Sequence, residues 1–538
     1  SVYRLKGLIR LNITDINFFI MKNSTSAKSN WIYIAGLIIV FIVSFSYIFD
    51  SKLDLNGDNC AYYMLATSIV QGHGYADITT AAYTPSNVFP PGYPLLMTVV
   101  RLFTESFLPQ KVLNGLFLLG SAILLFFLIR KNKLSDQIAF VAASAILLNY
   151  QVLHFATMMM SEMSFLFTSV LACWFIYKMD EKKAFWKDPF FYLAIITAAY
   201  NYHIRTQGIA LIAAILGYFL FTRQWKQMLG FAGGFILCLL PWMIRNKITG
   251  LGQSRYIDMI ASSNHWRPEE GTLDFLEIIS RFLDTFQMLL TKALPNSIIP
   301  YRNVNYDTAT TWGEWGISII LLALIIVGMC RFGKYKYLFL FYTLATFGVI
   351  SIFSTPSGNR YITPLLPFLE TSLLIGLYTI LTKGIQKIKL AKTFSPWLLI
   401  SLFIFFSLPK LQELRAINKM TYPPNYQNFF KIAEEIRKQV PTQTVVCSRK
   451  PELFYMYSKT AVTMYAWTEN EEELITGLIN SGTDYVVLEQ LGYSSTGRYL
   501  YPAIQKNPEL FPIVMHLKNP DTYLLKFDKE KAKQKFKQ

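Results

Sequence analysis

Charged residues are scarce in this sequence. Of its 538 residues only 16% are Asp, Glu, Lys or Arg, and 53% are hydrophobic, whereas soluble domains carry about 25% charged residues. This composition excludes an ordinary soluble enzyme and predicts a polytopic membrane protein. The net charge of +17 does not indicate a nucleic-acid partner, because the basic residues occur in short clusters between apolar runs, where they set membrane topology.

Cysteine is also scarce, and the five Cys residues make no disulfide framework. Cys173, Cys238 and Cys330 lie inside apolar runs and are expected to be packing residues. Cys60 and Cys447 fall on the external side of the topology derived below, where a single disulfide between them is an open alternative.

The sequence lacks an internal repeat, and its one low-complexity tract is the basic tail at 529–538, which we expect to be solvated and disordered. A cleavable signal peptide is not evident, because the first apolar run is long enough to stay as an anchor. The segment that starts at Met21 reads like a natural beginning, so residues 1–20 are expected to be an extension within a cytoplasmic segment over 1–30.

Long apolar runs dominate what is present. A spanning helix needs roughly 20 apolar residues, and the sequence predicts eleven spans at 31–49, 112–129, 138–155, 164–177, 189–203, 208–221, 228–244, 313–330, 337–353, 361–381 and 397–406. These runs predict a mainly α-helical transmembrane domain over 31–408.

The basic clusters orient these spans. They fall in alternate loops, at 130–133, 178–183, 223–226, 331–336 and 383–392. The positive-inside rule places all five in the cytoplasm with the N-terminus. The loops 50–111 and 245–312, and everything after about residue 407, are then external.

The chain changes composition after the last span. The stretch 425–440 has helical periodicity, and 444–448, 484–490 and 522–527 read as strands. We therefore expect a small external α/β domain over 409–528.

The first external loop contains "LNGDNCAYYMLATSIVQGHGY", which places a carboxylate close to the first span. Asp58 alone is equally consistent with an acid that caps a helix end in water. A helix beginning near Asn59 would bring Tyr62 and Tyr63 beside that carboxylate, and His73 follows in a glycine-rich turn. These side chains are candidates for a substrate pocket.

A second acid, Glu162, lies in the next external loop at the start of the fourth span. A purely structural explanation is available, because Ser161 suits a helix N-cap and Glu162 suits the helix dipole. Yet both acids lie on the same side of the membrane, and His154 precedes Glu162 by eight residues. Two carboxylates and a His in one pocket would suit a general base, a site for Mg²⁺ or Mn²⁺ on Asp58 and Glu162, or both.

Three arginines stand at external helix ends, against the usual bias that keeps Arg inside: Arg205, Arg245 and Arg360. Interfacial snorkelling accounts for at least one of them. A permanent charge with a bidentate fork is also what recognition of a lipid phosphate requires.

Taken in order, these motifs resemble a known family. The acid after the first span, "SE" before the fourth, "PWMIRN" before the second large loop and "RYITPLLP" late in the bundle resemble the GT-C glycosyltransferases. The sequence is most similar to bacterial members related to protein O-mannosyltransferases and lipid A aminoarabinose transferases. The resemblance covers roughly residues 30–410 and rests on the order and shared sidedness of the motifs.

The resemblance implies a GT-C bundle that transfers a sugar from a polyprenyl-phosphate carrier to an acceptor outside the cytoplasm, in a bacterial inner membrane. By the same resemblance Asp58 is the catalytic acid of the first loop and Glu162 the second acidic position. Many members carry another acid next to the catalytic one, but Asn59 stands there, so a metal requirement stays open. Arg360 and Tyr361 match the late motif, and we expect them to contact the donor phosphate.

The chemistry is consistent with these residues. A polyprenyl phosphate leaves as a stable anion, so one base, Asp58, suffices to deprotonate the acceptor hydroxyl, with inversion at the anomeric carbon. Arginines would neutralise the departing phosphate. The acceptor, whether glycan, lipid or protein, is not defined by these residues.

Three other functions are open at this point. A transporter or flippase would carry its charges near mid-bilayer on broken helices in repeated halves, whereas the charges here are interfacial. An oligosaccharide ligase would use a diphosphate-linked donor and an Arg-centred external loop, whereas the first-loop acid favours GT-C. A structural protein would leave the clustered acids and arginines unexplained.

Overall fold

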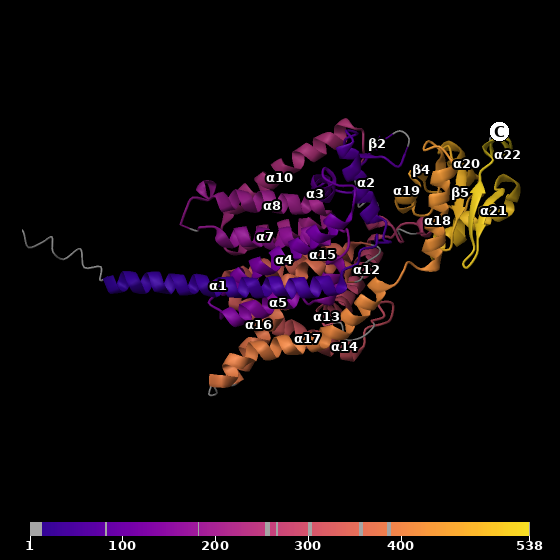
Figure 1. Cartoon of the computed structure of the whole chain (residues 1–538). Coiled ribbons are helices and arrows are strands. Elements are labelled where there is room, and N and C mark those ends of the chain that lie inside the picture. Colours follow the sequence, from indigo (N-terminus) through magenta and orange to yellow (C-terminus); the bar gives the residue numbers. More distant parts are fainter. Residues whose placement is uncertain are drawn as a thin grey trace, which may run out of the picture.

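The computed structural model describes residues 13–80, 83–180, 182–252, 259–264, 267–299, 304–353, 359–384 and 389–536. A bundle of long helices forms most of the molecule, and a small α/β domain lies at one end of it (Figure 1). The helices of the bundle are α1 (Ile13–Ile48), α4 (Leu108–Lys131), α5 (Asp136–Ile146), α6 (Tyr150–Ala156), α7 (Glu162–Lys178), α8 (Pro189–Ile204), α9 (Ile209–Phe221), α10 (Trp225–Ile248), α14 (Trp312–Met329), α15 (Lys336–Ile352), α16 (Leu366–Gly384) and α17 (Lys389–Lys419).

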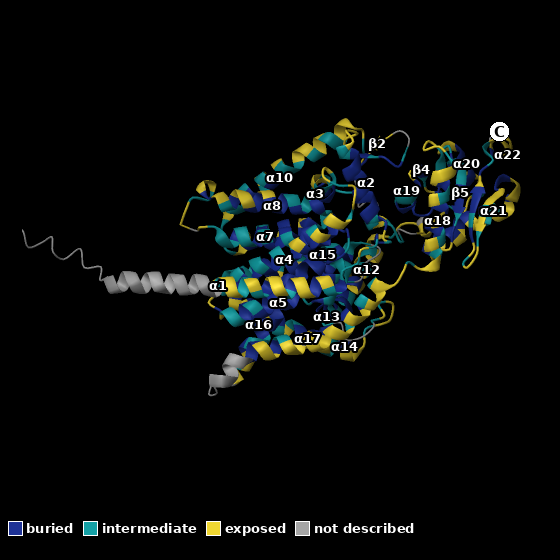
Figure 2. Cartoon of the chain, viewed as in Figure 1, coloured by how far each residue is buried: buried dark blue, intermediate teal, exposed yellow. Residues whose placement is uncertain are grey.

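The apolar composition of these helices confirms a multi-pass membrane protein. Figure 2 shows exposed residues along the outer faces of α1, α10, α14 and α17 and buried residues between the helices. Many exposed side chains are large and apolar, such as Ile236 and Leu237 on α10, which are 56% and 66% exposed. In water such surfaces would be unfavourable, whereas lipid chains cover them at no cost.

The number of spans differs from the sequence-based count. Within the described ranges, six helical stretches are long and apolar enough to cross a membrane, or seven if the bent pair α5–α6 forms one span. The predicted runs at 164–177, 189–203 and 208–221 do form helices, but α7, α8 and α9 contain only 17, 16 and 13 residues. One long stretch holds both α14 and α15, separated by the non-helical Phe332 and Gly333. Eleven spans are therefore not confirmed.

The third predicted span is broken. Helices α5 and α6 meet at an angle of 59°. The side chain of Asn149 caps α6 by accepting a hydrogen bond from the amide of Val152, and its own amide donates to Ser297 O and Glu370 Oε2. One buried side chain therefore fixes the break and joins it to two other segments of the bundle.

Small residues bring two helices into close contact. A Cβ atom on Gly328 of α14 would lie 1.7 Å from the carbonyl oxygen of Ser372, and one on Gly376 of α16 would lie 2.0 Å from that of Leu324. Only glycine fits at either position. Such close approach maximises the van der Waals contact that holds membrane helices together.

Part of the predicted external loop 245–312 is helical. Helix α10 extends to Ile248, and further along the chain lie α12 (Phe275–Met288), a π-helical turn (Leu289–Ala293) and α13 (Leu294–Ile298). Asp274 and Glu277 form a capping box at the start of α12, a D-x-x-E signal that the sequence contains. Leu294 and Ile298 belong to the main hydrophobic core.

The first loop contains α2 (Asp58–Val70), α3 (Gly92–Arg101) and a short hairpin, β1 (Ala76–Asp77) with β2 (Thr84–Pro85). The buried side chains of this loop pack on the C-terminal domain as well as on the bundle. Cys60 and Tyr62 share a hydrophobic core with Phe429 and Phe454 of the C-terminal domain. The first loop is therefore enclosed between the bundle and that domain.

The C-terminal domain has a five-stranded sheet in the order β4-β3-β5-β7-β6, with β3 parallel to β4 and β5, and β7 antiparallel to β5 and β6. The predicted helix at 425–440 and the three predicted strands correspond to α18, β3, β5 and β7, whereas β4 and β6 were not predicted. The elements are α18 (Pro424–Gln439), β3 (Val445–Cys447), α19 (Pro451–Ser458), β4 (Ala461–Thr463), α20 (Glu471–Asn480), β5 (Tyr485–Leu488), α21 (Tyr501–Lys506), β6 (Ile513–Leu517), β7 (Thr522–Lys526) and α22 (Lys529–Phe536).

One expectation for this domain was wrong. The basic tail is not disordered over 529–536 but forms α22, because Ala532 and Phe536, one turn apart, pack onto the domain core. The open alternative of a disulfide is also excluded in this structure, since Cys60 and Cys447 are free and buried.

Candidate functional site

A cavity of about 370 Å³ lies where the first loop meets the ends of several bundle helices. Its polar lining includes Asp58, Arg205 and Arg360. The remaining lining is mainly aromatic and apolar: Tyr62, Phe89, Pro90, Tyr202, Ile204, Thr206, Gln207, Ile209, Met259, Val349, Ile350, Phe353 and Tyr361. The cavity thus combines an ionic wall with an apolar wall.

The turn before α2 places Asp58 at the cavity. Gly57 adopts φ +99°, a conformation that favours glycine, and α2 begins at the next residue. The fully buried Asn59 supports this turn from both sides, because its side-chain oxygen accepts from the amide of Gly57 at 2.9 Å and its amide donates to Asp54 O at 2.9 Å. Asn59, next to Asp58, therefore holds the turn in place through its side chain.

Arg360 joins the two predicted acids. It stands at the start of a 3-10 turn (Arg360–Leu365) that leads into α16. Its Nη2 lies 3.2 Å from Asp58 Oδ2, and its Nε lies 2.5 Å from Glu162 Oε1. Two carboxylates about a hundred residues apart are thus held by one guanidinium group.

Arg205 binds the same carboxylate from the other side. Its Nη1 lies 2.8 Å from Glu162 Oε1 and 3.1 Å from Ser161 Oγ. The sequence predicted that the Ser161 hydroxyl caps α7, but it does not. It accepts a hydrogen bond from Arg205 instead. The side chain of Glu162 is only 1% exposed, whereas that of Asp58 is 39% exposed. Glu162 therefore supports the arginines from behind, and Asp58 faces the cavity.

The charges of this cluster balance. Two guanidinium groups face two carboxylates, so the net charge is zero when all four are ionised. A buried charge without a partner is strongly unfavourable, and this pairing explains how the arginines stay at a cavity rather than in bulk water.

Two tyrosines complete the cavity. The ring of Tyr361 lies under both arginines, 5.3 Å from the guanidinium carbon of Arg205 and 6.0 Å from that of Arg360. The hydroxyl of Tyr62 lies 3.5 Å from Ser161 Oγ. Burial raises the pKa of Tyr62, and the carboxylate of Asp58 acts in the same direction, so this side chain stays a neutral phenol.

Four other predicted residues lie outside the lining of the cavity. Tyr63 donates to Glu105 O at 2.6 Å and carries Arg101 over its ring. His73 lies in an exposed turn, stacked on Tyr83. His154 stacks on Tyr150 and contacts Phe155 edge-on within α6.

Arg245 is the fourth of these residues. Its guanidinium donates to Ser86 O at 2.7 Å and to Tyr75 O at 2.6 Å, and it lies over the rings of Tyr75 and Trp242. Both carbonyl groups belong to the first loop. Arg245 therefore holds that loop against the end of α10.

The described residues do not form an evident metal site. No group of three or more His, Cys, Asp or Glu side chains that could hold a metal occurs in the part of the chain that the structure describes. Of the two predicted ligands, Glu162 directs Oε1 at two guanidinium groups, which repel a cation. The residues present do not fit a metal ion well, and the predicted role of Asp58 and Glu162 as metal ligands stays a prediction.

Sequence reasoning missed a buried ion pair beneath the two acids. Lys111 Nζ of α4 lies 3.1 Å from Asp54 Oδ1, and both side chains are buried. Asp54 Oδ2 accepts from the amide of Met159, and Asn114 donates to the carbonyls of Met158 and Met160. This network fixes the segment before Asp58 to the segment before Glu162. The available signal was the recurrence of polar residues at 110, 111 and 114 at the start of an apolar span.

The C-terminal domain also reaches the first loop. Lys450, immediately before α19, donates from Nζ to the carbonyls of Leu55 and Asn56, three and two residues before Asp58. Glu452 lies nearby; burial raises the pKa of its carboxyl, and Asp77 and Asp58 add to the shift. The turn that carries Asp58 is therefore held from the bundle side and from the domain side.

Comparison with known proteins matches this architecture. Residues 89–244 match the sequence model of a family described as dolichyl-phosphate-mannose-protein mannosyltransferase. No curated protein matches the sequence. The fold is similar to that of ArnT from Cupriavidus metallidurans in the apo state, with a TM-score of 0.59 at 13% identity, covering 93% of this chain and 98% of ArnT. The structure of ArnT from the same organism bound to undecaprenyl phosphate gives a TM-score of 0.57 at 11% identity, covering 92% and 97%.

The likeness to ArnT shows the fold over nearly the whole of both chains, and the family match covers the segment from the first-loop wall of the cavity through Glu162 and Arg205 to the end of α10. These findings confirm the resemblance noted in the sequence and the mainly α-helical fold class with a small C-terminal sheet domain. The chain therefore has the fold of ArnT, and its residues 89–244 are similar to a family of protein mannosyltransferases.

Proposed function

We propose that this protein transfers a sugar from a polyprenyl-phosphate donor to an acceptor hydroxyl, with inversion, and that Asp58 is the base. The observation that carries the proposal is one shared cavity in which a partly exposed carboxylate stands beside two guanidinium groups and an apolar wall. Base, phosphate-binding groups and a surface for the lipid chain are the three elements that such a reaction requires.

In this reaction the acceptor hydroxyl attacks the anomeric carbon and its proton passes to the Asp58 carboxylate. A bond forms between the acceptor oxygen and that carbon, and the bond from the carbon to the phosphate oxygen breaks. The electron pair leaves on the polyprenyl phosphate, so the leaving group needs no proton. Because attack and departure occur on opposite faces of the carbon, the configuration inverts.

The charge balance of the cluster suits this sequence of events. Before reaction two guanidinium groups face two carboxylates. When Asp58 takes up the acceptor proton, the cluster gains one net positive charge at the moment the phosphate gains one negative charge. Electrostatic stabilisation placed where charge develops is usually the largest contribution to catalysis.

We assign the donor phosphate to Arg205 and Arg360, with Tyr361 beneath them. The apolar lining, among it Ile209, Val349 and Phe353, would receive the first isoprene units. The ArnT structure with bound undecaprenyl phosphate supports a donor of this class for the same fold.

The other predicted residues take positioning roles in this proposal. Glu162 holds both arginines in place, and Arg245 secures the first loop through two carbonyl groups. We further propose that the cavity opens on the external face of the bacterial inner membrane, because the five basic clusters lie at the other helix ends. The acceptor is then a glycan, lipid or protein of the cell envelope.

The proposal is tested with purified protein in detergent and a panel of polyprenyl-phosphate sugars. The assay follows release of free polyprenyl phosphate, with and without cell-envelope extract as acceptor. We expect release that depends on the extract, and a loss of about 10²- to 10⁴-fold in Asp58→Asn. Glu105→Gln, which removes an exposed carboxylate of the same loop, serves as the matched control.

The outcomes separate the functions. Full activity in a folded Asp58→Asn protein would exclude Asp58 as the base. If the wild-type protein releases nothing across the panel but acts on diphosphate-linked sugars, a ligase is favoured. Movement of a lipid-linked substrate across the bilayer of proteoliposomes, without transfer of its sugar, would indicate a flippase.

A further inference from the structure

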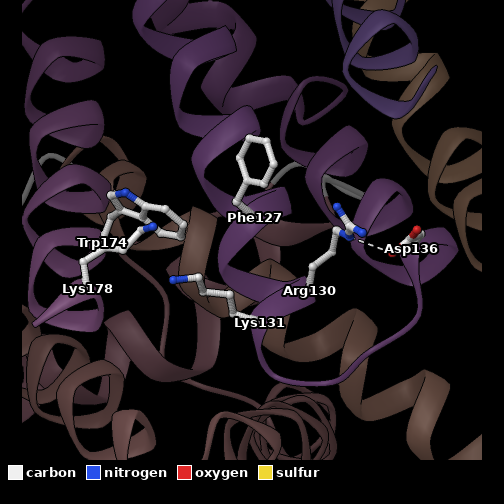
Figure 3. Close-up of a pocket in the computed structure, with 6 residues that line it drawn as sticks. All are labelled: Phe127, Arg130, Lys131, Asp136, Trp174 and Lys178. Atoms are coloured by element: carbon white, nitrogen blue, oxygen red, sulfur yellow. Dashed lines mark hydrogen bonds and ion pairs between the residues drawn. The ribbon is translucent and has the colours of Figure 1, made fainter. Parts of the chain in front are cut away.

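A second polar cavity, of about 520 Å³, lies near the opposite end of α7 (Figure 3). It is lined by three cationic side chains, one carboxylate and two aromatic rings, which come from the last turns of α4 and α7 and the start of α5: Phe127, Arg130, Lys131, Asp136, Trp174 and Lys178. Nothing in the proposed transfer reaction uses these residues.

This cavity lies at the other membrane surface from the Asp58 cavity. Glu162 is the first residue of α7 and Lys178 is the last. Seventeen residues at about 1.5 Å per residue separate the two ends by roughly 25 Å, close to the hydrocarbon thickness of roughly 30 Å. The second cavity therefore lies at the level of lipid headgroups.

The cations in the cavity outnumber the anions. Asp136 is bound by Arg130 at 2.6 Å. Within the described ranges neither Lys131 nor Lys178 forms an ion pair with a carboxylate; both ammonium groups lie against the ring of Trp174, at 5.3 and 4.9 Å from its centre. In Figure 3 the side chain of Lys131 points towards Trp174 and Lys178.

Two like charges on one indole ring repel each other, and an anion between them would remove that repulsion. Lysines are common at this membrane surface for topological reasons alone, so their presence is not sufficient. What differs here is that Lys131 and Lys178 line one cavity, whereas Lys133, Lys182 and Lys183 nearby lie outside its lining.

The two aromatic rings of the cavity favour the anionic group of a lipid over a soluble anion. Phe127 lies about one helical turn before Lys131, and Trp174 one turn before Lys178, both on the side of the bilayer core. A soluble anion would gain nothing from these rings, whereas the upper part of an acyl chain would pack against them.

We propose that this cavity binds the phosphate group of an anionic phospholipid, with Lys131 and Lys178 on the phosphate oxygens and the chain against Phe127 and Trp174. Binding is non-covalent and independent of the proposed transfer reaction. Its role is to fix the ends of α4 and α7 at the membrane surface.

The test uses the full chain in lipid nanodiscs and the fluorescence of Trp174, obtained as the difference between the wild type and Trp174→Phe. Phosphatidylglycerol with brominated chains is compared with brominated phosphatidylcholine in nanodiscs of otherwise equal composition. We expect stronger quenching by the anionic lipid, with the preference reduced about tenfold in Lys131→Gln/Lys178→Gln. Lys182→Gln/Lys183→Gln is the control with the same loss of charge outside the cavity.

Each outcome decides the proposal. Equal quenching by both lipids, or equal loss of preference in the control variant, overturns it. Displacement of the anionic lipid by millimolar inorganic phosphate assigns the cavity to a soluble phosphate and overturns the lipid assignment. If the double Gln variant does not fold, Lys131→Arg/Lys178→Arg replaces it, and loss of the preference in this charge-preserving variant contradicts binding through charge.

Discussion

The two ends of α7 carry polar clusters of different character. At its start, Glu162, Asp58 and two arginines form a closed set in which every charge has an opposite partner. At its end, Lys131 and Lys178 lie against aromatic rings, both over Trp174 and Lys131 also over Tyr177, and neither forms an ion pair with a carboxylate of the described residues. The first cluster is enclosed by the bundle, the first loop and the C-terminal domain, and the second lies at an open helix end.

The difference follows from the cost of burying charge. A charge removed from water requires an opposite partner, or it destabilises the fold by several kcal/mol, roughly 3–5 when one partner is taken away. At a headgroup interface water and lipid phosphates supply that partner. A closed, neutral cluster therefore keeps its charged groups in fixed positions, whereas an open, basic cluster leaves its charges available to water and lipid phosphates.

After the loss of Asp58, the largest effect is expected from breaking the closed cluster at Arg360. Arg360→Ala leaves Asp58 without its partner and Glu162 with only Arg205, so kcat/KM should fall about 10²- to 10³-fold, with a higher KM for the donor. Arg360→Lys should restore little of this, because an ammonium group cannot bridge both carboxylates as a guanidinium does. Steady-state kinetics with a defined donor measures both values, and an unchanged donor KM would remove Arg360 from the phosphate site.

The next effect concerns stability beneath that cluster. Asp54→Ala or Lys111→Met alone should lower the free energy of unfolding by about 3 kcal/mol, because each leaves one buried charge unpaired. The double variant should be less destabilised than the sum of the single ones. Unfolding in mixed micelles measures these values. Additive losses would show that the pair is not coupled.

Glu162→Gln should have a smaller effect, because the amide oxygen still accepts a hydrogen bond from an arginine. We expect kcat to fall about tenfold, because the two arginines then donate to an uncharged amide oxygen in place of a carboxylate. The same assay with a chelator tests the predicted cation. A loss of wild-type activity that Mg²⁺ or Mn²⁺ restores would support the metal role of Asp58 and Glu162, and an unaffected enzyme would contradict it.

The smallest effect is expected outside the bundle, at Lys450. Lys450→Gln weakens the contacts to the carbonyls of Leu55 and Asn56, so the turn before Asp58 loosens, and kcat should fall about threefold to tenfold with little change in KM. Lys438→Gln, an exposed lysine of α18 paired only with Glu435, is the control. If both variants have wild-type kcat, the C-terminal domain does not position the turn.

Much of the fold was predictable from local patterns. Each apolar run lies on a helix, and the sequence around 425–440 and 522–527 predicted α18 and β7. The strands β4 and β6, which form the two edges of the sheet, were missed. Helix α22 was missed because Lys dominates its composition, and only the core of the domain gives Ala532 and Phe536 a surface to pack on.

The site was predictable in part. Asp58, Glu162 and Arg360 were singled out because charged residues are few and stand at span ends. The spacing of the arginines in the sequence does not predict their partners. Arg205 and Arg360 share one carboxylate, whereas Arg245 binds backbone carbonyls. Arginines at similar helix ends can have different neighbours in space. A single sequence does not show which residues lie next to each of them.

The sequence by itself determined that this chain spans a membrane and which family it resembles, and it predicts the side that each acid and arginine faces, because hydropathy and charge act through local composition. The tertiary structure alone decided which charges meet. Asp58 and Arg360 are separated by about three hundred residues of chain, and their 3.2 Å contact depends on the packing of the first loop, α7, α8 and α16. Burial forces each of these charges to find a partner, but only the fold determines which partner lies within reach.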